Sequence, residues 1–409
     1  MSALADSLFI LADDLSGAAD CAMGAAKSGL KSIVLFNPAI AEQAQVIAID
    51  ADCRYRPAAE AGAINVALWQ AQATSERLFY KKIDSTLRGN FAAEMAALTR
   101  AGVAIVAPAF PATGRTTQNG RVFVKGVPLE QTEIWANESI PGQADIVAML
   151  RSAGISATNI TLPGVRNKLR DEISRLVAGK TVQAIVCDAE EEADLAAIAA
   201  ASVGLPVYWV GSAGLATHLP QAAGLVGQAA SPRLAVSGPI VTVVGSLSAV
   251  SRQQAQVLES HADFAVFVPT PALLRTGETH PLWQSLRDQI GEALSAGRDV
   301  MIRTGLEEHN DLTYGHALCE SLGSLVLPLA PAIGALIATG GETARALLPT
   351  FGTHALQLIK EVEPGVPLSL ALGKQQIPVI TKAGAFGSPA ALLKSYSELA
   401  RIRSGNVVA

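Results

Sequence analysis

The sequence predicts an α/β protein of two domains, each with a mostly parallel sheet flanked by helices, and a ligand cleft between the domains. Two observations predict this class. Short apolar runs alternate with Ala-rich runs along most of the chain, a pattern typical of βαβ units. The chain also has 409 residues, which is more than one hydrophobic core usually serves.

The alternation divides the chain into two series of expected elements. In the first series the expected strands are residues 8–11, 32–36, 46–49, 77–80, 103–107 and 184–187, and the expected helices are residues 17–27, 58–74 and 91–101. In the second series the expected strands are residues 240–244, 264–268, 299–303, 335–338 and 378–380. Residues 221–239 are rich in Gly, Ala, Ser and Pro and break the periodicity, so we expect domains at residues 1–230 and 231–409.

Composition excludes several classes of protein. The net charge of −5 argues against a nucleic-acid surface. The longest uncharged runs contain prolines, so they predict buried strands rather than membrane spans. The four cysteines are far apart in the sequence, and no signal peptide is visible, which favours a cytoplasmic protein. The sequence leaves the oligomeric state open and allows a homo-oligomer.

One polar stretch, residues 80–90, stands between an expected strand and an expected helix. It carries Lys82, Asp84, Ser85, Thr86 and Arg88. Ligands of open α/β sheets bind where a strand ends and a helix begins, and a helix start favours an anion. The alternative is a polar turn that only caps the next helix.

Further candidates follow other strands of the first series. Asp13 and Asp14 come directly after the first strand, where paired carboxylates can bind Mg²⁺, accept a hydroxyl or act as a base. The alternative is that Asp14 caps the next helix. Arg54 follows the third strand, and its guanidinium suits a carboxylate. Arg115 lies in a rigid, polar stretch and could reach an anion, and the alternative is that this stretch is only a structural turn.

In the second series, Gly-rich turns follow three expected strands, at residues 244–248, 339–344 and 382–387. Such turns let a backbone approach a ligand closely, and three in one domain predict a nucleotide site. Tight packing is the alternative for each turn alone. The chain lacks the GxGxxG fingerprint, which argues against a nicotinamide enzyme, and Leu30 stands where a P-loop lysine would be.

Taken together and in order, these motifs resemble those of the four-carbon acid sugar kinase family. The motifs are ADDLSGA (12–18), YKKIDSTLRGN (80–90), PAFPATGRTTQNG (108–120), VGSAGLA (210–216), VGSLS (244–248), ATGGETA (338–344) and ITKAGAFGS (380–388). The resemblance implies a sugar-acid-binding N-terminal domain and a nucleotide-binding C-terminal domain. It also implies ATP-dependent phosphorylation of the C4 hydroxyl of a small four-carbon sugar acid.

The resemblance further assigns roles to individual residues. The implied substrate positions are Asp13, Arg54, Lys82, Asp84, Ser85, Thr86 and Arg88. The implied ATP positions are Ser246, Thr339, Gly340, Gly341, Glu342 and Gly384. One departure is Cys53, where we expect serine, so that edge of the expected substrate pocket lacks a hydroxyl.

The expected mechanism needs a base, a metal and a substrate. Asp14 or Asp84 would take the proton from the attacking hydroxyl, while Arg54 with Lys82 or Arg88 would hold the sugar carboxylate. Mg²⁺ would bridge the ATP phosphates, with Glu342 or Asp13 in its shell. By the same resemblance, the form of the 80–90 motif favours the threonate or erythronate group over the 3-oxo-tetronate group. We expect D-threonate first, and the alternatives are D-erythronate and 3-oxo-tetronate. A rival of another class is a non-catalytic sensor that binds a sugar acid and a nucleotide.

Overall fold

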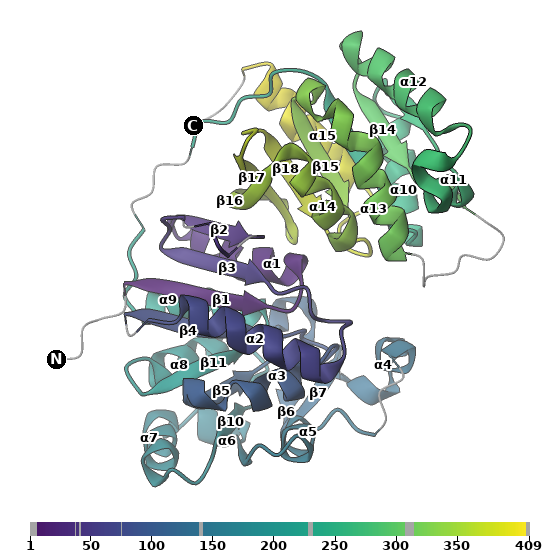
Figure 1. The fold of residues 1–409 in the computed structure, drawn as a ribbon. Coiled ribbons are helices and arrows are strands. Elements are labelled where there is room, and N and C mark those ends of the chain that lie inside the picture. The colour runs from purple at the N-terminus through teal and green to yellow at the C-terminus, as the bar shows by residue number, and fades with distance from the viewer. Residues whose placement is uncertain are drawn as a thin grey trace. The chain divides into compact units, whose positions relative to one another are not determined.

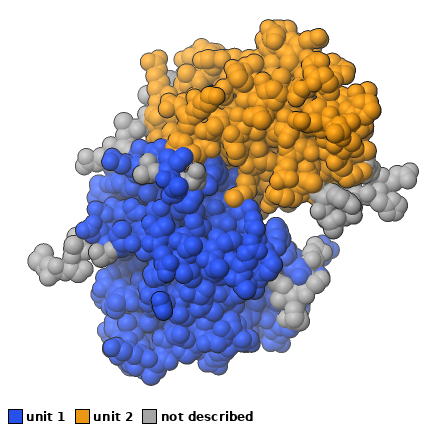
Figure 2. All heavy atoms as spheres, viewed as in Figure 1, with its two compact units in different colours: residues 1–229 blue, residues 230–409 orange. Residues whose placement is uncertain are grey.

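The protein is described by a computed structural model, which covers residues 6–36, 38–40, 42–74, 76–138, 142–227, 232–306 and 315–405. The chain divides into two compact units, residues 1–229 and 230–409 (Figure 2). Each unit has its own sheet and its own helices. In the described part of the chain, no helix is long and apolar enough to cross a membrane.

The sheet of the first unit is parallel throughout, and its strands run in the order β2-β3-β1-β4-β11-β5-β10-β9 (Figure 1). Its strands are β1 (Ser7–Ala12), β2 (Ser32–Leu35), β3 (Val46–Asp50), β4 (Arg77–Lys82), β5 (Val103–Ala107), β9 (Ala157–Ile160), β10 (Ala184–Cys187) and β11 (Val207–Gly211). Its helices are α1 (Leu15–Lys27), α2 (Ala58–Gln72), α3 (Phe91–Ala97), α4 (Glu133–Glu138), α5 (Ile146–Ser152), α6 (Leu162–Val165), α7 (Leu169–Gly179), α8 (Glu192–Ser202) and α9 (Ala213–Ala222). Central strands such as β1 are apolar along their length because helices cover both faces of the sheet.

The direction in which the connections run across the sheet reverses between β1 and β4, which are neighbouring parallel strands. The connection from β1 through α1 leads to β2 on one side, and the connection from β4 through α3 leads to β5 on the other. Because such crossovers are right-handed, α1 and α3 cover opposite faces. Accordingly α1 contacts α9, which contacts α8, whereas α3 contacts α2. The ends of β1 and β4 therefore form a topological switch point, where such folds bind ligands.

A small antiparallel sheet follows β5 in the first unit. It contains β6 (Arg115–Gln118), β7 (Arg121–Val124) and β8 (Val127–Pro128). Asp188, at the end of β10, accepts hydrogen bonds from the backbone N–H groups of Asn119 (2.6 Å) and Gly120 (2.9 Å). This buried carboxylate ties the β6–β7 turn to the main sheet.

The sheet of the second unit has strand order β13-β14-β12-β15-β18-β17-β16. The strands are β12 (Ile240–Val244), β13 (Ala265–Phe267), β14 (Val300–Arg303), β15 (Ala335–Thr339), β16 (Thr353–Glu363), β17 (Val366–Gly373) and β18 (Pro378–Lys382). The helices are α10 (Ala249–Glu259), α11 (Pro271–Thr276), α12 (Trp283–Ser295), α13 (Gly315–Val326), α14 (Gly341–Leu347) and α15 (Ala391–Arg403). The connection from β12 leads to β13, whereas the connection from β14 leads the other way to β15, so β12 and β15 flank a second switch point.

The predicted α/β class with mostly parallel sheets is confirmed, and two local expectations need correction. Strands β16 and β17 form an antiparallel hairpin that the alternation did not predict. The helix expected over residues 91–101 ends at Ala97 and continues as a 3-10 turn over Thr99–Ala101, ahead of Gly102 at φ 122°. Glycine is the residue that adopts this backbone conformation without strain, which explains where the helix stops.

Candidate active site

The switch point of the first unit brings the predicted substrate residues together. Ala12 of β1 lies beside Lys82 of β4 in the sheet, so Asp13 and Asp14 emerge next to the turn that carries Asp84 and Arg88. Both turns lie at the carboxyl ends of their strands, as predicted. The structure also places Ser85 in this turn, half-buried, and Thr86, which is buried.

Arg54 is held by two of these acids. Its Nε and one terminal nitrogen donate to the two carboxylate oxygens of Asp13 at 2.7 and 3.0 Å. The other terminal nitrogen donates to Asp14 at 2.9 Å. Because all three nitrogens face carboxylates and the side chain is only 9% exposed, Arg54 orients the acids. A direct contact between Arg54 and a substrate carboxylate stays a prediction.

The two neighbouring acids differ in access. Asp13 is buried, and although burial raises its pKa, the charges of Arg54 and Lys82 outweigh burial and hold the pKa below its usual value. Asp14 accepts the N–H of Gly17 at 2.9 Å and so caps α1, as the alternative interpretation predicted. Its side chain is still 29% exposed, so Asp14 is the carboxylate of this pair that another molecule can reach.

Lys82 lies beneath the two acids as a buried cation. Burial alone would lower its pKa, but Asp13 and Asp14 raise it above the ordinary value, so the ammonium stays charged. Gly17 leaves room for this side chain, since a Cβ at that position would lie 2.4 Å from the lysine Nζ. Gly17 of the ADDLSGA motif therefore provides the space that Lys82 of the YKKIDSTLRGN motif occupies.

Asp84 is occupied by its own turn. One carboxylate oxygen accepts from the backbone N–H of Thr86 at 2.8 Å and from the Thr86 hydroxyl. The other oxygen accepts from Arg88 at 2.7 Å. Burial raises the pKa of Asp84, but Arg88, Arg54 and Lys82 outweigh burial and hold it well below the usual range. A carboxylate whose pKa is held this low is a weak base. The contacts of Asp84 instead suit it to holding the Arg88 guanidinium in position.

A buried polar cluster that the sequence did not predict lies below the site. Lys81 is fully buried and forms an ion pair with Glu94 of α3 at 2.8 Å. The thiol of Cys53 donates to Glu94 at 3.1 Å and accepts from the Asn65 side chain at 3.3 Å. Cys53 is therefore buried in this cluster, and its place at an edge of the substrate pocket stays a prediction.

In the second unit, the three Gly-rich turns meet at the ends of the adjacent strands β12, β15 and β18. The N–H of Ser246 donates to the carbonyl of Thr339 at 3.3 Å, and the N–H of Gly340 donates to the carbonyl of Lys382 at 2.8 Å. A Cβ at Gly384 would lie 2.2 Å from the Ser246 hydroxyl. Gly341 and Glu342 begin α14 at the same place. The predicted nucleotide residues thus form one cluster.

Lys382 is a further residue of this cluster that the sequence did not single out. The carbonyl of Gly384 accepts from Lys382 Nζ at 3.1 Å, from Ser248 at 3.0 Å and from Ser251 at 2.6 Å. Burial lowers the pKa of Lys382 to about 8, and Glu363 offsets part of this effect. The position of Lys382 where a strand meets a Gly-rich turn is the signal by which the sequence could have indicated it.

The two carboxylates expected near Mg²⁺ differ in their fit to a metal. Asp13 does not fit, because both of its oxygens are taken by Arg54. Glu342 fits as a single ligand, since its side chain is 46% exposed and lies 3.2 Å from His316. Among the residues described, no three His, Cys, Asp or Glu side chains form a metal cage. Mg²⁺ usually needs only one or two carboxylates when phosphates supply other ligands.

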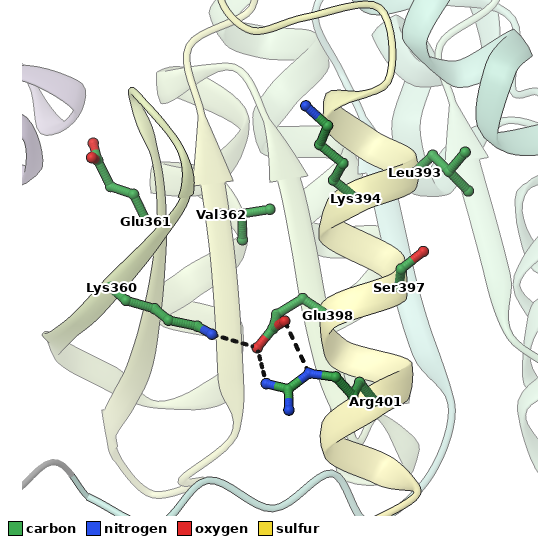
Figure 3. Close-up of a pocket in the computed structure, with 8 residues that line it drawn as sticks. All are labelled: Lys360, Glu361, Val362, Leu393, Lys394, Ser397, Glu398 and Arg401. Atoms are coloured by element: carbon green, nitrogen blue, oxygen red, sulfur yellow. Dashed lines mark hydrogen bonds and ion pairs between the residues drawn. The ribbon is translucent and has the colours of Figure 1, made fainter. Parts of the chain in front are cut away.

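A pocket elsewhere in the second unit contains none of these residues. It lies between β16 and α15 (Figure 3). Glu398 lies in it and forms ion pairs with Lys360 at 2.8 Å and with Arg401 at 2.7 Å (Figure 3). These charged side chains are paired with one another, and none of the predicted substrate or nucleotide residues lines this pocket.

Two family models match the chain. Residues 8–219 match a sugar-binding N-terminal domain, and residues 241–392 match a nucleotide-binding C-terminal domain. A D-threonate kinase from Cupriavidus necator is 47% identical, covering 97% of this chain and 99% of the relative. The chain belongs to the four-carbon acid sugar kinase family. Other members are less similar: a D-threonate kinase from Salmonella typhimurium is 32% identical over 94% of this chain and 96% of the relative. A 3-oxo-tetronate kinase from Pseudomonas savastanoi is 28% identical over 95% and 96%.

Solved structures agree with the fold of this kinase family member. A crystal structure from Salmonella typhimurium has a TM-score of 0.80 at 23% identity, covering 96% of this chain and 99% of that one. The crystal structure of Haemophilus influenzae protein HI1011 has a TM-score of 0.76 at 20% identity, covering 96% and 100%. At these identities the likeness shows the fold alone.

Proposed function

We propose that the protein uses ATP to phosphorylate the C4 hydroxyl of a four-carbon sugar acid, foremost D-threonate. The observation that carries this proposal is an accessible carboxylate, Asp14, beside Arg54 and Lys82 at the switch point of the first unit, where Arg54 also lies 3.9 Å from the Asp84 carboxylate that holds Arg88. The names of the relatives support the same substrate class.

Phosphoryl transfer depends on positioning and on neutralising charge more than on covalent help from the protein. Asp14 would take the proton of the attacking hydroxyl, because it is the more exposed of the two candidate bases. Asp84 would keep Arg88 in place, since it already binds that guanidinium at 2.7 Å. The cations would bind the acid group of the substrate.

The second unit would hold ATP at the cluster of Gly-rich turns. Ser246 and the N–H groups of residues 339–342 would contact phosphate oxygens. When bound with ATP, Mg²⁺ would neutralise phosphate charge, and Glu342 would supply one oxygen to it. The ligand cleft expected between the two units stays a prediction.

Replacing Gly384 tests the nucleotide site. In Gly384→Ala the new Cβ would collide with the Ser246 side chain, whose atoms lie 2.2 and 2.9 Å from the Cβ position. Overpacking of this kind costs about 1–3 kcal/mol, so we expect the KM for ATP to rise about 5- to 100-fold. The KM for the sugar acid should not change.

The matched control is Gly291→Ala in α12 of the same unit. A Cβ there meets only the Leu329 side chain at an ordinary 3.4 Å, so this variant should keep the wild-type KM for ATP. Equal KM values for ATP in both variants would contradict the assignment of Gly384 to the nucleotide site.

The substrate is tested by assaying several acids side by side. ATP consumption would be measured with D-threonate, D-erythronate, L-threonate and 3-oxo-tetronate, using the full chain. We expect the highest kcat/KM with D-threonate. Substrate-dependent release of ADP also excludes a non-catalytic sensor, whereas its absence with every acid would contradict the proposed function.

A further inference from the structure

Two arginines from different turns of the first unit, Arg88 and Arg115, lie near enough to Asp84 to interact with its charge. Arg88 follows β4 and donates to Asp84 at 2.7 Å. Arg115 begins β6, and its guanidinium donates to the backbone carbonyl of Thr113 at 3.1 Å. Within the described ranges, no carboxylate lies within ion-pair distance of Arg115. The Nε atoms of Arg88 and Arg115 are both buried without a hydrogen-bond partner.

The backbone fixes the position of Arg88. Leu87 has φ 57° and Gly89 has φ 85°, so the chain turns sharply on both sides of the arginine. A non-glycine residue at φ above zero is strained and persists only where its surroundings hold it. A Cβ at Gly89 would lie 3.3 Å from an oxygen of Asp13, which shows how closely this turn lies against the acids.

The loop that carries Arg115 is held equally firmly. The carbonyl of Ala109 accepts from the Ser212 hydroxyl at 2.9 Å, and Gly214 lies so close that a Cβ there would be 2.6 Å from the same carbonyl. The N–H of Lys125 donates to the carbonyl of Gly114 at 2.6 Å. The loop that carries Arg115 is therefore fixed by these contacts. The Nε–H of Arg115 lacks a partner although the side chain is attached to an ordered loop.

Charge at the switch point is unbalanced in favour of an anion. The cations are Lys82, Arg54, Arg88 and Arg115, and the carboxylates are Asp13, Asp14 and Asp84, so four positive groups meet three negative ones. Burial lowers the pKa of Arg115, the charge of Asp84 offsets part of this effect, and the positive charge of Arg88 adds to it. One monoanion would neutralise the cluster and use the free donors.

We propose that Arg115, together with Arg88, binds the carboxylate of the sugar acid. This inference rests on the proposed function and names the residues that would recognise the acid group. Arg54 is less suited, because its nitrogens are already bound to Asp13 and Asp14. A guanidinium binds a carboxylate through paired hydrogen bonds, and two such groups would discriminate a four-carbon acid from a neutral polyol or amide.

The test compares an acid with its neutral analogue. Binding of D-threonate and of D-threonamide to the full chain would be measured by titration calorimetry for wild type, Arg115→Gln and Arg115→Lys. We expect Arg115→Gln to weaken D-threonate binding about 10- to 100-fold, the scale of a hydrogen bond to a charged group, and to leave D-threonamide binding unchanged. Arg115→Lys should restore part of the loss, and the KM for ATP should not change.

The control is Arg121→Gln, on the neighbouring strand of the same small sheet, where the arginine pairs with Glu130. This variant should keep the preference for D-threonate, which shows that the small sheet is intact. An equal loss for acid and amide in Arg115→Gln would overturn the inference, and so would a rise in the KM for ATP, which would indicate contact with the transferred phosphoryl group.

Failure of this inference differs from failure of the proposed function. If wild type phosphorylates D-threonate and Arg115→Gln keeps the preference for the acid, only the role of Arg115 is wrong. If wild type neither binds nor phosphorylates any four-carbon acid, the proposed function fails, and the inference fails with it.

Discussion

Asp14→Asn is expected to lower kcat by at least about 100-fold, the usual contribution of a general base. Both carboxylates accept hydrogen bonds within the site, but 29% of the Asp14 side chain is exposed against 12% of the Asp84 side chain, so Asp14 is the one that a substrate reaches more easily. Asparagine still caps a helix, so α1 should remain folded. The KM for ATP should be unchanged, and steady-state kinetics at saturating substrate would measure the effect.

The matched control for this variant is Asp145→Asn. Asp145 caps α5 by accepting the N–H of Ala148 at 2.9 Å, the same kind of contact that Asp14 makes with Gly17. The control loses a capping carboxylate without touching the site, so its kcat should be that of wild type. If Asp14→Asn turned over normally while Asp84→Asn did not, Asp84 would be the base.

Glu94→Leu is expected to destabilise the protein by about 3–5 kcal/mol, because it leaves the buried ammonium of Lys81 without its partner. The pair lies directly below the site, since Lys81 precedes Lys82 on β4 and Glu94 is on α3. The free energy of unfolding, measured by denaturant titration, would show the loss.

The double variant Lys81→Met with Glu94→Leu is the control. Replacing a buried ion pair by apolar groups of similar size is often neutral, so most of the stability should return. If the single variant lost less than about 1 kcal/mol, the value typical of an exposed ion pair, Lys81 would not be a buried, paired charge.

The parallel part of the fold was predictable because the buried strands are nearly uniform apolar runs. Strands β1 and β12 are examples, and both are buried along almost their whole length. The hairpin of β16 and β17 was not predicted, because one strand mixes buried and exposed residues, and its register shifts along the pair.

The site was predictable to the level of its motifs, because a strand end followed by polar residues is a local signal. The hydrogen-bond and ion-pair partners of these residues within the site were not predictable from the sequence. The sequence does not show that Arg54 is saturated by Asp13 and Asp14, or that Lys81 turns inward to Glu94 while Lys82 faces the acids. Adjacent residues of a strand point to opposite faces, but their partners come from other segments.

Transfer of a phosphoryl group from ATP to the C4 hydroxyl of a four-carbon sugar acid is tested by determining the structure of the product. Purified full-length protein would be incubated with ATP, Mg²⁺ and D-threonate, and the product examined by mass spectrometry and ³¹P–¹H correlation. We expect a stable phosphate ester whose phosphorus couples to the C4 protons, formed together with ADP. An acyl phosphate, an adenylated acid or no phosphorylated product with any of the four acids would contradict it.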